Sequence, residues 1–359
     1  MSKRIVIVGG GYLGAELAKA LETEAEVTLV EQANHFVHAP AMIRAIVKPE
    51  LLERALIPYD KLLSKGQIER GRVTGVDHAG VTLDDGRRVE GDYIVLATGS
   101  THTSPFKPVR GDIDALKQAN RQVHEKLLQA QSIAIVGSGS VGIELAGEIA
   151  HAMPEKKIVL VSDKKALLPD MPRKLGRSLE AKLKSAGVEI VFGARAENLQ
   201  STSEPYTGTV QLDNGQTITV DLIFPVIGSK ANSSLLETLP DVRKTAAGRI
   251  ATDGWMRPSS LENVFAAGDV AENGDAMTIV GITRQLPWLT KTLKAVLSGK
   301  SIVDVKPYVP WKKAPILLPL GPRKGSSFLV LFTAGNWVTS KIKGLDLFLT
   351  KYNKSFGRN

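Results

Sequence analysis

The most constraining feature of the sequence is a glycine-rich pattern that occurs twice. In each copy an apolar run of strand length leads into three spaced glycines, and the apolar residues after them have helical spacing. The three glycines are Gly9, Gly11 and Gly14 in the first copy and Gly137, Gly139 and Gly142 in the second. In such a βαβ unit the first glycine permits a tight turn, the second lets the backbone approach a pyrophosphate, and the third allows the helix to pack closely. The pattern therefore predicts two dinucleotide-binding units.

An acidic residue completes the first unit. Glu31 ends the apolar run 27–30 and lies where a dinucleotide site places an acid that accepts hydrogen bonds from the adenosine ribose. Two units in one chain indicate two bound dinucleotides. We expect FAD at the first unit and NADH or NADPH, as the hydride donor, at the second.

The second unit departs from this pattern at the end of its second strand. Ser162 stands where an enzyme specific for NADH would usually have an acid, and Asp163 is displaced by one position. Lys164 and Lys165 follow at once and are suited to hold a ribose 2′-phosphate. We expect NADPH to be accepted on this basis, and the alternative is two solvated lysines in a loop.

Two further apolar runs end at a glycine, one at Thr98-Gly99 and the other at Gly268-Asp269. The order of all these motifs resembles the two-dinucleotide-binding-domain flavoprotein superfamily. The resemblance implies that Thr98 and Gly99 mark the crossing from an FAD-binding domain into an inserted NAD(P)-binding domain, and that the second pair marks the return. It also implies that Asp269 holds the ribityl hydroxyls of the flavin. The alternative role for Asp269 is to cap a turn.

Within that superfamily the chain resembles the apoptosis-inducing-factor-like branch, which includes membrane-associated NAD(P)H:ubiquinone reductases. The resemblance extends over nearly the whole chain and is carried by segments 36–45, 231–234 and 343–348. It implies that His38 and Arg44 lie against the flavin and that Lys343 and Phe348 approach the flavin and a quinone pocket. The alternatives are a turn histidine, a surface arginine and a solvated lysine. For Phe348 the alternative is a packing stripe at helical spacing, made of Leu345, Phe348, Leu349, Tyr352 and Phe356.

Glu144 lies two residues after the last glycine of the second unit, on the first turn of the predicted helix. The resemblance implies that its carboxylate faces the nicotinamide and the flavin. A carboxylate near a helix N-terminus is also stabilising without any further role. Glu16 occupies the equivalent position in the first unit, which keeps that alternative open.

We expect an α/β fold with two Rossmann-like domains and a small α+β cap, because one hydrophobic core seldom grows to 359 residues. Residues 1–105 and 246–300 are predicted to form the FAD-binding domain, which is interrupted by an NAD(P)-binding domain at 106–245. Residues 301–359 are predicted to form a basic C-terminal cap that faces the quinone and a membrane.

Positive charge is concentrated at the C-terminal end. Residues 291–359 contain 13 Lys and Arg but only two acids, Asp304 and Asp346, so this region alone carries +11 while the whole chain carries +9. Such a region favours an anionic partner, and we expect peripheral contact with an anionic membrane surface. The alternatives are a solvated basic face, docking of an acidic carrier protein such as ferredoxin or rubredoxin, and nucleic-acid binding. No nucleic-acid-binding motif accompanies the charge, so nucleic acid is the least favoured partner.

The chain contains no cysteine, so electrons cannot leave a flavin through a disulfide relay. We therefore expect an FAD-dependent oxidoreductase that passes electrons from NAD(P)H to a quinone in direct contact with the flavin. The six histidines lack the spacing of metal ligands, so no metal site is predicted. The start of the sequence has no secretory signal and no glycine for myristoylation, so we expect a cytoplasmic location. The oligomeric state is left open, with a dimer among the alternatives.

Overall fold

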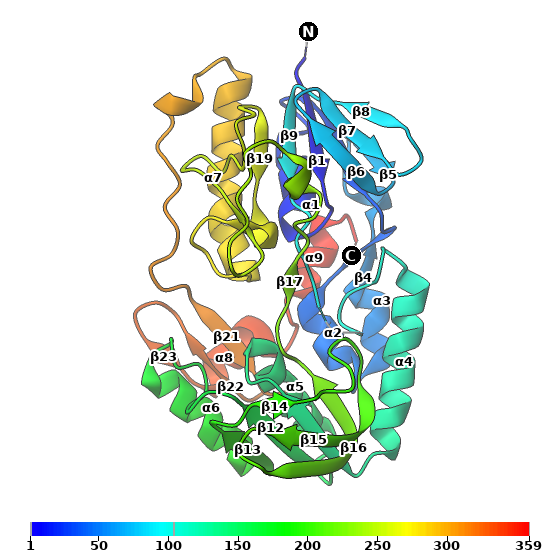
Figure 1. Ribbon diagram of the computed structural model, residues 1–359, viewed down its shortest axis with the longest axis vertical. Helices are drawn as coiled ribbons and strands as arrows, with labels where there is room; N and C mark the ends of the chain where they lie inside the picture. Colours follow the sequence, from blue (N-terminus) through cyan, green and yellow to red (C-terminus); the bar gives the residue numbers. More distant parts are fainter. Residues whose placement is uncertain (1, 103–104, 359) are drawn as a thin grey trace.

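The protein is described here by a computed structural model covering residues 2–102 and 105–358. It has two parallel-sheet units, one above the other in Figure 1, and a smaller C-terminal region beside the lower unit. This architecture confirms the predicted α/β class with two dinucleotide-binding units and an α+β addition.

The first sheet is parallel throughout and has the strand order β19-β9-β1-β2-β5. Its strands are β1 (Arg4–Val8), β2 (Glu26–Glu31), β5 (Gln67–Arg70), β9 (Tyr93–Leu96) and β19 (Val264–Ala266). Helix α1 (Tyr12–Leu21) makes the crossover from β1 to β2. The antiparallel meander of β6 (Val73–Asp77), β7 (Gly80–Leu83) and β8 (Arg88–Glu90) leads from β5 to β9.

Between β2 and β5 the chain leaves the sheet and forms a small layer that reaches the second unit. This layer consists of β3 (His35–Val37), α2 (Ala39–Ala45), α3 (Leu52–Ala55) and β4 (Leu56–Pro58). Strands β3 and β4 pair in antiparallel fashion, and α2 and α3 lie between them in the chain. Pro40 near the N-terminus of α2 suits the helix start, where its missing N–H leaves no bond unmade.

The second sheet has the strand order β13-β12-β11-β16-β15-β14, in which the first four strands are parallel and the last two antiparallel. Its strands are β11 (Ser132–Val136), β12 (Lys157–Ser162), β13 (Val188–Phe192), β14 (Ala196–Glu197), β15 (Tyr206–Leu212) and β16 (Thr217–Pro225). Helices α4 (Ile113–Gln129), α5 (Ser140–Ala152) and α6 (Arg173–Ser185) complete this unit.

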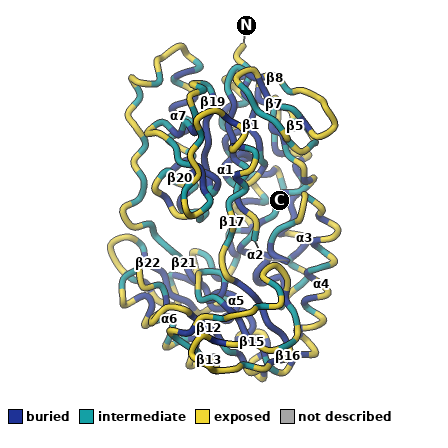
Figure 2. Tube along the Cα trace, viewed as in Figure 1, coloured by how far each residue is buried: buried dark blue, intermediate teal, exposed yellow. Residues whose placement is uncertain are grey.

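Both sheets are buried on their two faces because successive side chains of a strand point to opposite sides. In β1 the side chains of Ile5 and Ile7 join one core, while Val6 and Val8 join another. In β11 the side chains of Ile133 and Ile135 likewise join one core, while those of Ala134 and Val136 join another. Figure 2 shows the first of these buried strands in the upper unit. The continuous apolar runs of the sequence are therefore explained by two-sided burial.

The two units are joined by two short strands that lie side by side. β10 (Ser100–Thr101) leaves the first unit and pairs in antiparallel fashion with β17 (Lys230–Ala231), which returns to it. Leu236 and Leu239, which follow β17, already belong to a core of the first sheet. The division into domains stays a proposal, and this packing favours a return near residue 232 in place of 245.

After the return, β18 (Ile250–Ala251) pairs with β20 (Ala271–Glu272), and α7 (Ile279–Leu297) packs beside α1. An extended segment then leads to β21 (Ile316–Pro319), β22 (Gly325–Phe328) and β23 (Thr333–Ala334). Helix α8 (Asn336–Thr339), a π-helical turn (Ser340–Gly344) and α9 (Leu349–Ser355) end the described chain. No helix in the described ranges is long and apolar enough to cross a membrane.

Candidate functional site

The first glycine cradle is shaped by close backbone contacts. Gly9 has φ +103°, and a Cβ there would lie 2.4 Å from the carbonyl oxygen of Ala97. A Cβ at Gly14 would lie 1.9 Å from the carbonyl oxygen of Gly9, so the helix can approach the turn only without a side chain. A Cβ at Gly11 would meet nothing within 4 Å. The open space above Gly11, at the N-terminus of α1, fits a pyrophosphate.

Glu31 lies beside this cradle at the end of β2. Its carboxylate accepts hydrogen bonds from the backbone amides of Gly10, at 2.6 Å, and Ala33, at 2.7 Å. The Tyr59 hydroxyl donates to the carbonyl oxygen of Gly10 at 2.7 Å and so fixes the same glycine turn. These contacts hold the carboxylate in place while it remains partly exposed, as binding of a ribose requires.

The second cradle repeats the first. Gly137 has φ +115°, and a Cβ there would lie 2.1 Å from the carbonyl oxygen of Val226. A Cβ at Gly142 would lie 1.9 Å from the carbonyl oxygen of Gly137, and one at Gly139 would meet nothing within 4 Å. A cavity of about 800 Å³ opens over these glycines. The cavity is large enough for the nicotinamide coenzyme predicted at this unit.

Ser162 and Lys164 have different environments in the second unit. Ser162 is buried, and its hydroxyl lies 2.6 Å from that of Ser138 and accepts from the backbone amide of Lys164 at 3.2 Å. Lys164 is exposed and lines the cavity, together with Asp163 and Arg195. Sequence reasoning missed Arg195, which the sheet brings here because the amide of Ala194 bonds to the carbonyl oxygen of Ser162.

The crossing between the units is fixed by Thr98 and Asn232. The Thr98 hydroxyl donates to the carbonyl oxygen of Asn232, and the side-chain amide of Asn232 donates back to the carbonyl oxygen of Thr98, each at 2.8 Å. Gly99 has φ +68°, a left-handed conformation that glycine adopts readily. Both predicted crossing residues therefore lie at the junction of the two linkers.

Asp269 lies on the short 3₁₀ turn Gly268–Val270, close to that crossing. Its carboxylate accepts from the Ser100 hydroxyl at 2.6 Å. The Lys107 ammonium donates to the hydroxyl oxygen of Ser100 at 2.9 Å and to its carbonyl oxygen at 2.7 Å. Burial lowers the pKa of Lys107, and the nearby carboxylate of Asp269 opposes that change. The carboxylate is thus held by a polar chain that the sequence did not reveal.

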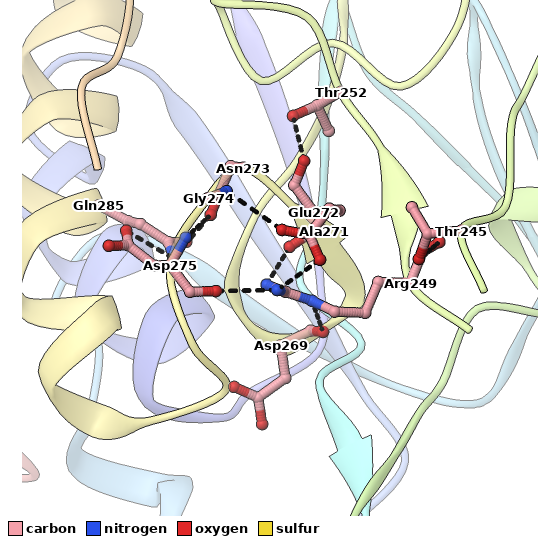
Figure 3. A network of polar contacts seen from close by, with 10 residues as sticks. All are labelled: Thr245, Arg249, Thr252, Asp269, Ala271, Glu272, Asn273, Gly274, Asp275 and Gln285. Carbon is pink, nitrogen blue, oxygen red and sulfur yellow. Dashed lines mark hydrogen bonds and ion pairs between the residues drawn. The ribbon is translucent and has the colours of Figure 1, made fainter. Parts of the chain in front are cut away.

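The backbone around Asp269 is held by a buried arginine, Arg249 (Figure 3). Its guanidinium donates to the carbonyl oxygens of Asp269 at 3.1 Å and Asp275 at 2.8 Å, to that of Ala271, and to the Glu272 carboxylate at 2.9 Å. Figure 3 shows the Asp269 carboxyl group pointing away from Arg249. Arg249 therefore fixes the turn and leaves the carboxylate available. No sequence motif surrounds this residue.

Gly268 has its own support from α7. It has φ +79°, and its amide donates to the side-chain oxygen of Gln285 at 2.8 Å. Gln285 is buried, so helix α7 holds the turn from the side opposite to Arg249. The spacing of Gln285 within an apolar helix gave no sign of this role.

Glu144 and Lys343 form a buried ion pair. The Lys343 ammonium lies 2.6 Å from the Glu144 carboxylate and donates to the carbonyl oxygen of Leu317 at 3.1 Å, and the two side chains are 11% and 6% exposed. Burial raises the pKa of the Glu144 carboxyl, and the Lys343 ammonium offsets part of that rise. The pair joins α5 of the second unit to the C-terminal π-helical turn.

Arg44 forms a second buried pair one helical turn further along α5. Its guanidinium binds both carboxylate oxygens of Glu148, at 2.8 and 2.9 Å, and donates to the carbonyl oxygen of Gly344 at 2.7 Å. Glu144 therefore contacts Lys343 directly, and Glu148 contacts Gly344 of the same π-helical turn through Arg44. Arg44 contacts the residue next to Lys343 and so fixes the position of that lysine.

His38 is completely buried between α1 and the C-terminal region. Its Nδ1 lies 3.0 Å from the Tyr12 hydroxyl, and its Nε2 lies 2.6 Å from the carbonyl oxygen of Leu347. Burial lowers the pKa of His38 to about 4, against the bond to Leu347, so the ring is neutral near pH 7. In that state Nε2 donates to the carbonyl and Nδ1 accepts from the tyrosine.

Phe348 is placed by an unusual backbone. Leu347 and Phe348 both have positive φ, +53° and +64°, and α9 begins only at Leu349. The predicted helical stripe from Leu345 to Phe356 is therefore only partly helical. Phe348 packs against the core of the first sheet, whereas Leu347 belongs to the core shared with the second unit. Phe348 therefore contacts the first unit, whereas Lys343 is paired with Glu144 of the second unit.

Comparison with known proteins agrees with this geometry. The family model described as pyridine nucleotide-disulphide oxidoreductase matches residues 59–289, and a second model with the same description matches residues 4–77. Apoptosis-inducing factor homolog B of Dictyostelium discoideum is 31% identical, over 98% of this chain and 96% of the relative. Ferroptosis suppressor protein 1 of Xenopus tropicalis is 27% identical, over 99% of this chain and 96% of the relative.

Solved structures show the same fold at lower identity. The ferredoxin reductase for the CYP199A2 system of Rhodopseudomonas palustris superposes with a TM-score of 0.69 at 18% identity, covering 91% of this chain and 88% of that one. Putidaredoxin reductase, in its covalent complex with putidaredoxin, gives a TM-score of 0.65 at 20% identity, covering 91% and 86%. The chain therefore belongs to the pyridine nucleotide-disulphide oxidoreductase family, as an NAD(P)H-dependent flavin oxidoreductase with FAD as its cofactor and with apoptosis-inducing factor homologues and ferroptosis suppressor protein 1 among its relatives.

Proposed function

We propose that this oxidoreductase passes electrons from NAD(P)H, through its FAD, directly to a ubiquinone-like quinone. FAD, when bound, accepts a hydride from NAD(P)H and can give the electrons up again to a second substrate. The observation that carries the proposal is the buried Lys343–Glu144 pair where the two units and the C-terminal region meet. A chain without cysteine offers no disulfide to relay the electrons, so the acceptor has to reach the flavin itself.

The pair supplies what reduction of a quinone requires. A quinone oxygen gains negative charge as it accepts electrons, and a positive group held away from water stabilises that charge strongly. Lys343 Nζ carries a proton that can be donated to such an oxygen. Glu144 lies 2.6 Å away as a carboxylate and holds the ammonium in position, and water can replace the donated proton on Nζ. We assign Lys343 to the acceptor and Glu144 to the alignment of the nicotinamide and of Lys343.

The remaining site residues are proposed to bind and orient. Asp269 is assigned to the ribityl hydroxyls of FAD, and neutral His38 and Phe348 to the surroundings of the flavin ring. Arg44 is assigned a positioning role, because its guanidinium is occupied by Glu148 and by the carbonyl oxygen of Gly344.

We further propose that Lys164 and Arg195 receive the 2′-phosphate of NADPH. Both line the cavity of the second unit, and the backbone bond between Gly193 and Lys164 brings their segments together. Ser162 is buried against Ser138, so no carboxylate at that position repels a phosphate. NADH is accepted as well, since the cradle itself binds the pyrophosphate common to both coenzymes.

The test is to follow the two half-reactions separately. The flavin is reduced anaerobically with NADPH or NADH and is then mixed with a short-chain ubiquinone, with a ferredoxin or with oxygen in a stopped-flow instrument. We expect the quinone to reoxidise the flavin much faster than oxygen does, and the Lys343→Met variant to slow this step and spare flavin reduction. Reoxidation by quinone no faster than by oxygen would exclude the proposal.

A second candidate acceptor is an acidic electron-carrier protein. The +11 charge of residues 291–359 favours it, as does the likeness to ferredoxin reductase and to putidaredoxin reductase bound to putidaredoxin. The same experiment separates the two candidates. Reoxidation by ferredoxin that exceeds reoxidation by quinone and falls steeply with salt would favour the carrier protein.

A further inference from the structure

Exposed apolar side chains are concentrated in one part of the C-terminal region. Leu331 is 90% exposed, Trp337 73% and Phe332 57%. Other large apolar residues exposed in this part of the described chain are Val330, Ile342 and Leu345. Soluble proteins rarely expose such a group of large apolar residues without a partner that covers it.

Three of these residues are consecutive and form the tip of a hairpin. β22 and β23 are joined by residues 329–332, and the amide of Leu329 bonds to the carbonyl oxygen of Phe332 at 2.9 Å. Val330, inside this turn, has φ +68°, a conformation that is costly for a β-branched residue. A glycine or asparagine would form this turn at a lower conformational cost, so the stability of the fold does not explain why a valine stands at position 330. The loop lies at the exposed edge of the C-terminal region in Figure 2.

Exposed cations lie on the segments next to this hairpin. Trp337 follows β23 directly on α8, and the ammonium of Lys341 lies 5.9 Å from the centre of its ring. Lys312 and Lys313, which precede β21 at the tip end of β22, are exposed, as are Arg323 and Lys324 at the far end of β22. After Asp304 the only acid in the sequence is Asp346, which is paired with Arg54 at 3.2 Å. The hairpin and its flanking segments therefore carry several cations and little acidic charge to balance them.

We propose that the hairpin tip (Val330, Leu331 and Phe332) and Trp337 insert into the headgroup layer of a membrane that carries anionic lipids. A narrow protruding tip can bury its apolar side chains on all sides in a lipid layer, and Trp prefers this interface. The lysines and arginines of the flanking segments then meet the anionic headgroups. Charge complementarity thus selects a membrane as the partner.

The inference deepens the proposed function and rests on it for the choice of a lipid surface, since long-chain quinones dissolve in membranes. Lys341 beside Trp337 and Lys343 beside Glu144 belong to the same π-helical turn. Docking through the tip therefore brings the proposed acceptor site close to the bilayer that contains the acceptor. The side chains that insert are separate from those assigned to catalysis.

The test uses the full chain loaded with FAD and vesicles of phosphatidylcholine with or without phosphatidylserine. Wild-type protein is expected to co-float with the phosphatidylserine vesicles and to release them at high salt. Leu331→Ser/Phe332→Ser is expected to lower the vesicle affinity by about a hundredfold or more, because each of the two buried side chains is worth about a factor of ten or more. Val109→Ser/Val303→Ser is the matched control, since Val109 and Val303 are 75% and 64% exposed far from the tip in sequence.

Fluorescence gives a second measurement. Trp337 is exposed, whereas Trp255, Trp288 and Trp311 are partly buried. Brominated lipids should quench emission of the wild-type protein, and Trp337→Phe should lose that quenching. The tip variant should still reduce a water-soluble quinone at the wild-type rate but should lose activity toward a long-chain quinone in vesicles.

Failure of docking and failure of the proposed function are distinguishable. Wild-type protein that reduces the water-soluble quinone but ignores the vesicles, or a tip variant that binds them normally, would overturn the docking surface alone. Vesicle binding through the tip without reduction of any quinone would leave the surface standing and remove the proposed function. Tip-dependent binding of an acidic ferredoxin in place of vesicles would assign the surface to a protein and overturn the membrane.

Discussion

The two dinucleotide units share a backbone and differ in a few side chains. Both sheets place the glycine-bearing strand between equivalent neighbours, with the second strand of the unit on one side and a later strand on the other. In both units a Cβ at the third glycine would lie 1.9 Å from the carbonyl oxygen of the first glycine. The units diverge after their second strands, where Glu31 offers a carboxylate to a ribose and Ser162 is buried against another serine. The fold therefore supplies a general pyrophosphate cradle, and single residues near it select the dinucleotide.

A second difference lies on the helices that follow the cradles. Glu16 and Glu144 occupy equivalent positions, yet Glu16 is partly exposed and accepts from the Ser355 hydroxyl at 2.5 Å, whereas Glu144 is buried against Lys343. The acid on the first unit is thus a local contact of α9. The acid on the second unit faces the junction where electrons are transferred in the proposed function.

The largest expected effect comes from blocking each cradle in turn. Gly11 and Gly139 have φ −68° and −69°, which any residue adopts, and a Cβ at either meets open space. Gly11→Val should therefore leave the fold intact but weaken FAD binding by about a hundredfold or more, since about 3 kcal/mol of pyrophosphate contact is lost. Gly139→Val should purify yellow and resist reduction by NAD(P)H.

Absorbance at the flavin band and the rate of anaerobic reduction measure these outcomes. The melting temperatures of the two FAD-free variants should match that of the FAD-free wild type. The assignment of FAD to the first unit would be wrong if Gly139→Val purified colourless while Gly11→Val retained flavin.

The next largest effect is expected from substitution of Glu144, in comparison with the equivalent acid Glu16. Glu144→Gln leaves the buried Lys343 without its counter-charge, which should lower the free energy of unfolding by about 3 kcal/mol and slow flavin reduction. Glu16→Gln removes a partly exposed contact and should cost less than about 1 kcal/mol. Chemical denaturation and stopped-flow reduction measure both quantities.

A double variant tests the cause of the loss. Glu144→Gln/Lys343→Met removes both charges and should recover much of the stability without recovering the quinone half-reaction. Equal effects of the Glu144 and Glu16 variants would mean that the two acids serve the helices alone.

Arg249 tests a feature of the first unit, because its guanidinium holds the backbone turn that carries Asp269. Arg249→Lys would leave part of the carbonyl set around Asp269 unsatisfied, at a cost of about 2 kcal/mol, and should weaken FAD binding by about tenfold. Arg243→Lys, at an exposed position, is the matched control. Titration of FAD into the FAD-free protein gives the affinity, and unchanged binding in Arg249→Lys would rule out a positioning role.

The duplicated glycines were enough to predict the two parallel units, because the turn, the open approach and the close helix contact each require glycine at a fixed spacing. Thr98 lies beside the return segment, and its role at a domain crossing stays a prediction of the superfamily resemblance. The residues that were missed come from another level of structure. Arg249 and Gln285 bond to backbone groups of the turn that carries Asp269, and Arg195 reaches the cavity across neighbouring strands. Such contacts leave no local pattern in a sequence.

The C-terminal region was the least predictable part. The apolar spacing from Leu345 to Phe356 indicated one helix, but Leu347 and Phe348 adopt positive φ and shorten it. Tertiary contacts outweigh the pattern here, since the carbonyl oxygen of Leu347 bonds to buried His38 and that of Gly344 to Arg44. A helix through these residues would use both carbonyl groups within its own ladder.

The smallest expected effect concerns the choice of coenzyme. Lys164 and Arg195 line the cavity next to Ser162, whereas Lys165 is exposed outside its lining. Lys164→Ala/Arg195→Ala should reduce kcat/KM for NADPH by about tenfold and leave that for NADH nearly unchanged, because exposed charge contacts to a phosphate are screened by water and each contributes modestly. Lys165→Ala should change neither value.

The ratio of kcat/KM for the two coenzymes, measured at constant ionic strength, is the deciding quantity. A fall in both values by the same factor would indicate general attraction of anionic coenzymes in place of recognition of the 2′-phosphate. If neither value changed, the absence of an acid at Ser162 would have no counterpart in coenzyme choice. The difference between the units would then lie in the acids on their helices, Glu16 and Glu144, and not at the ends of their second strands.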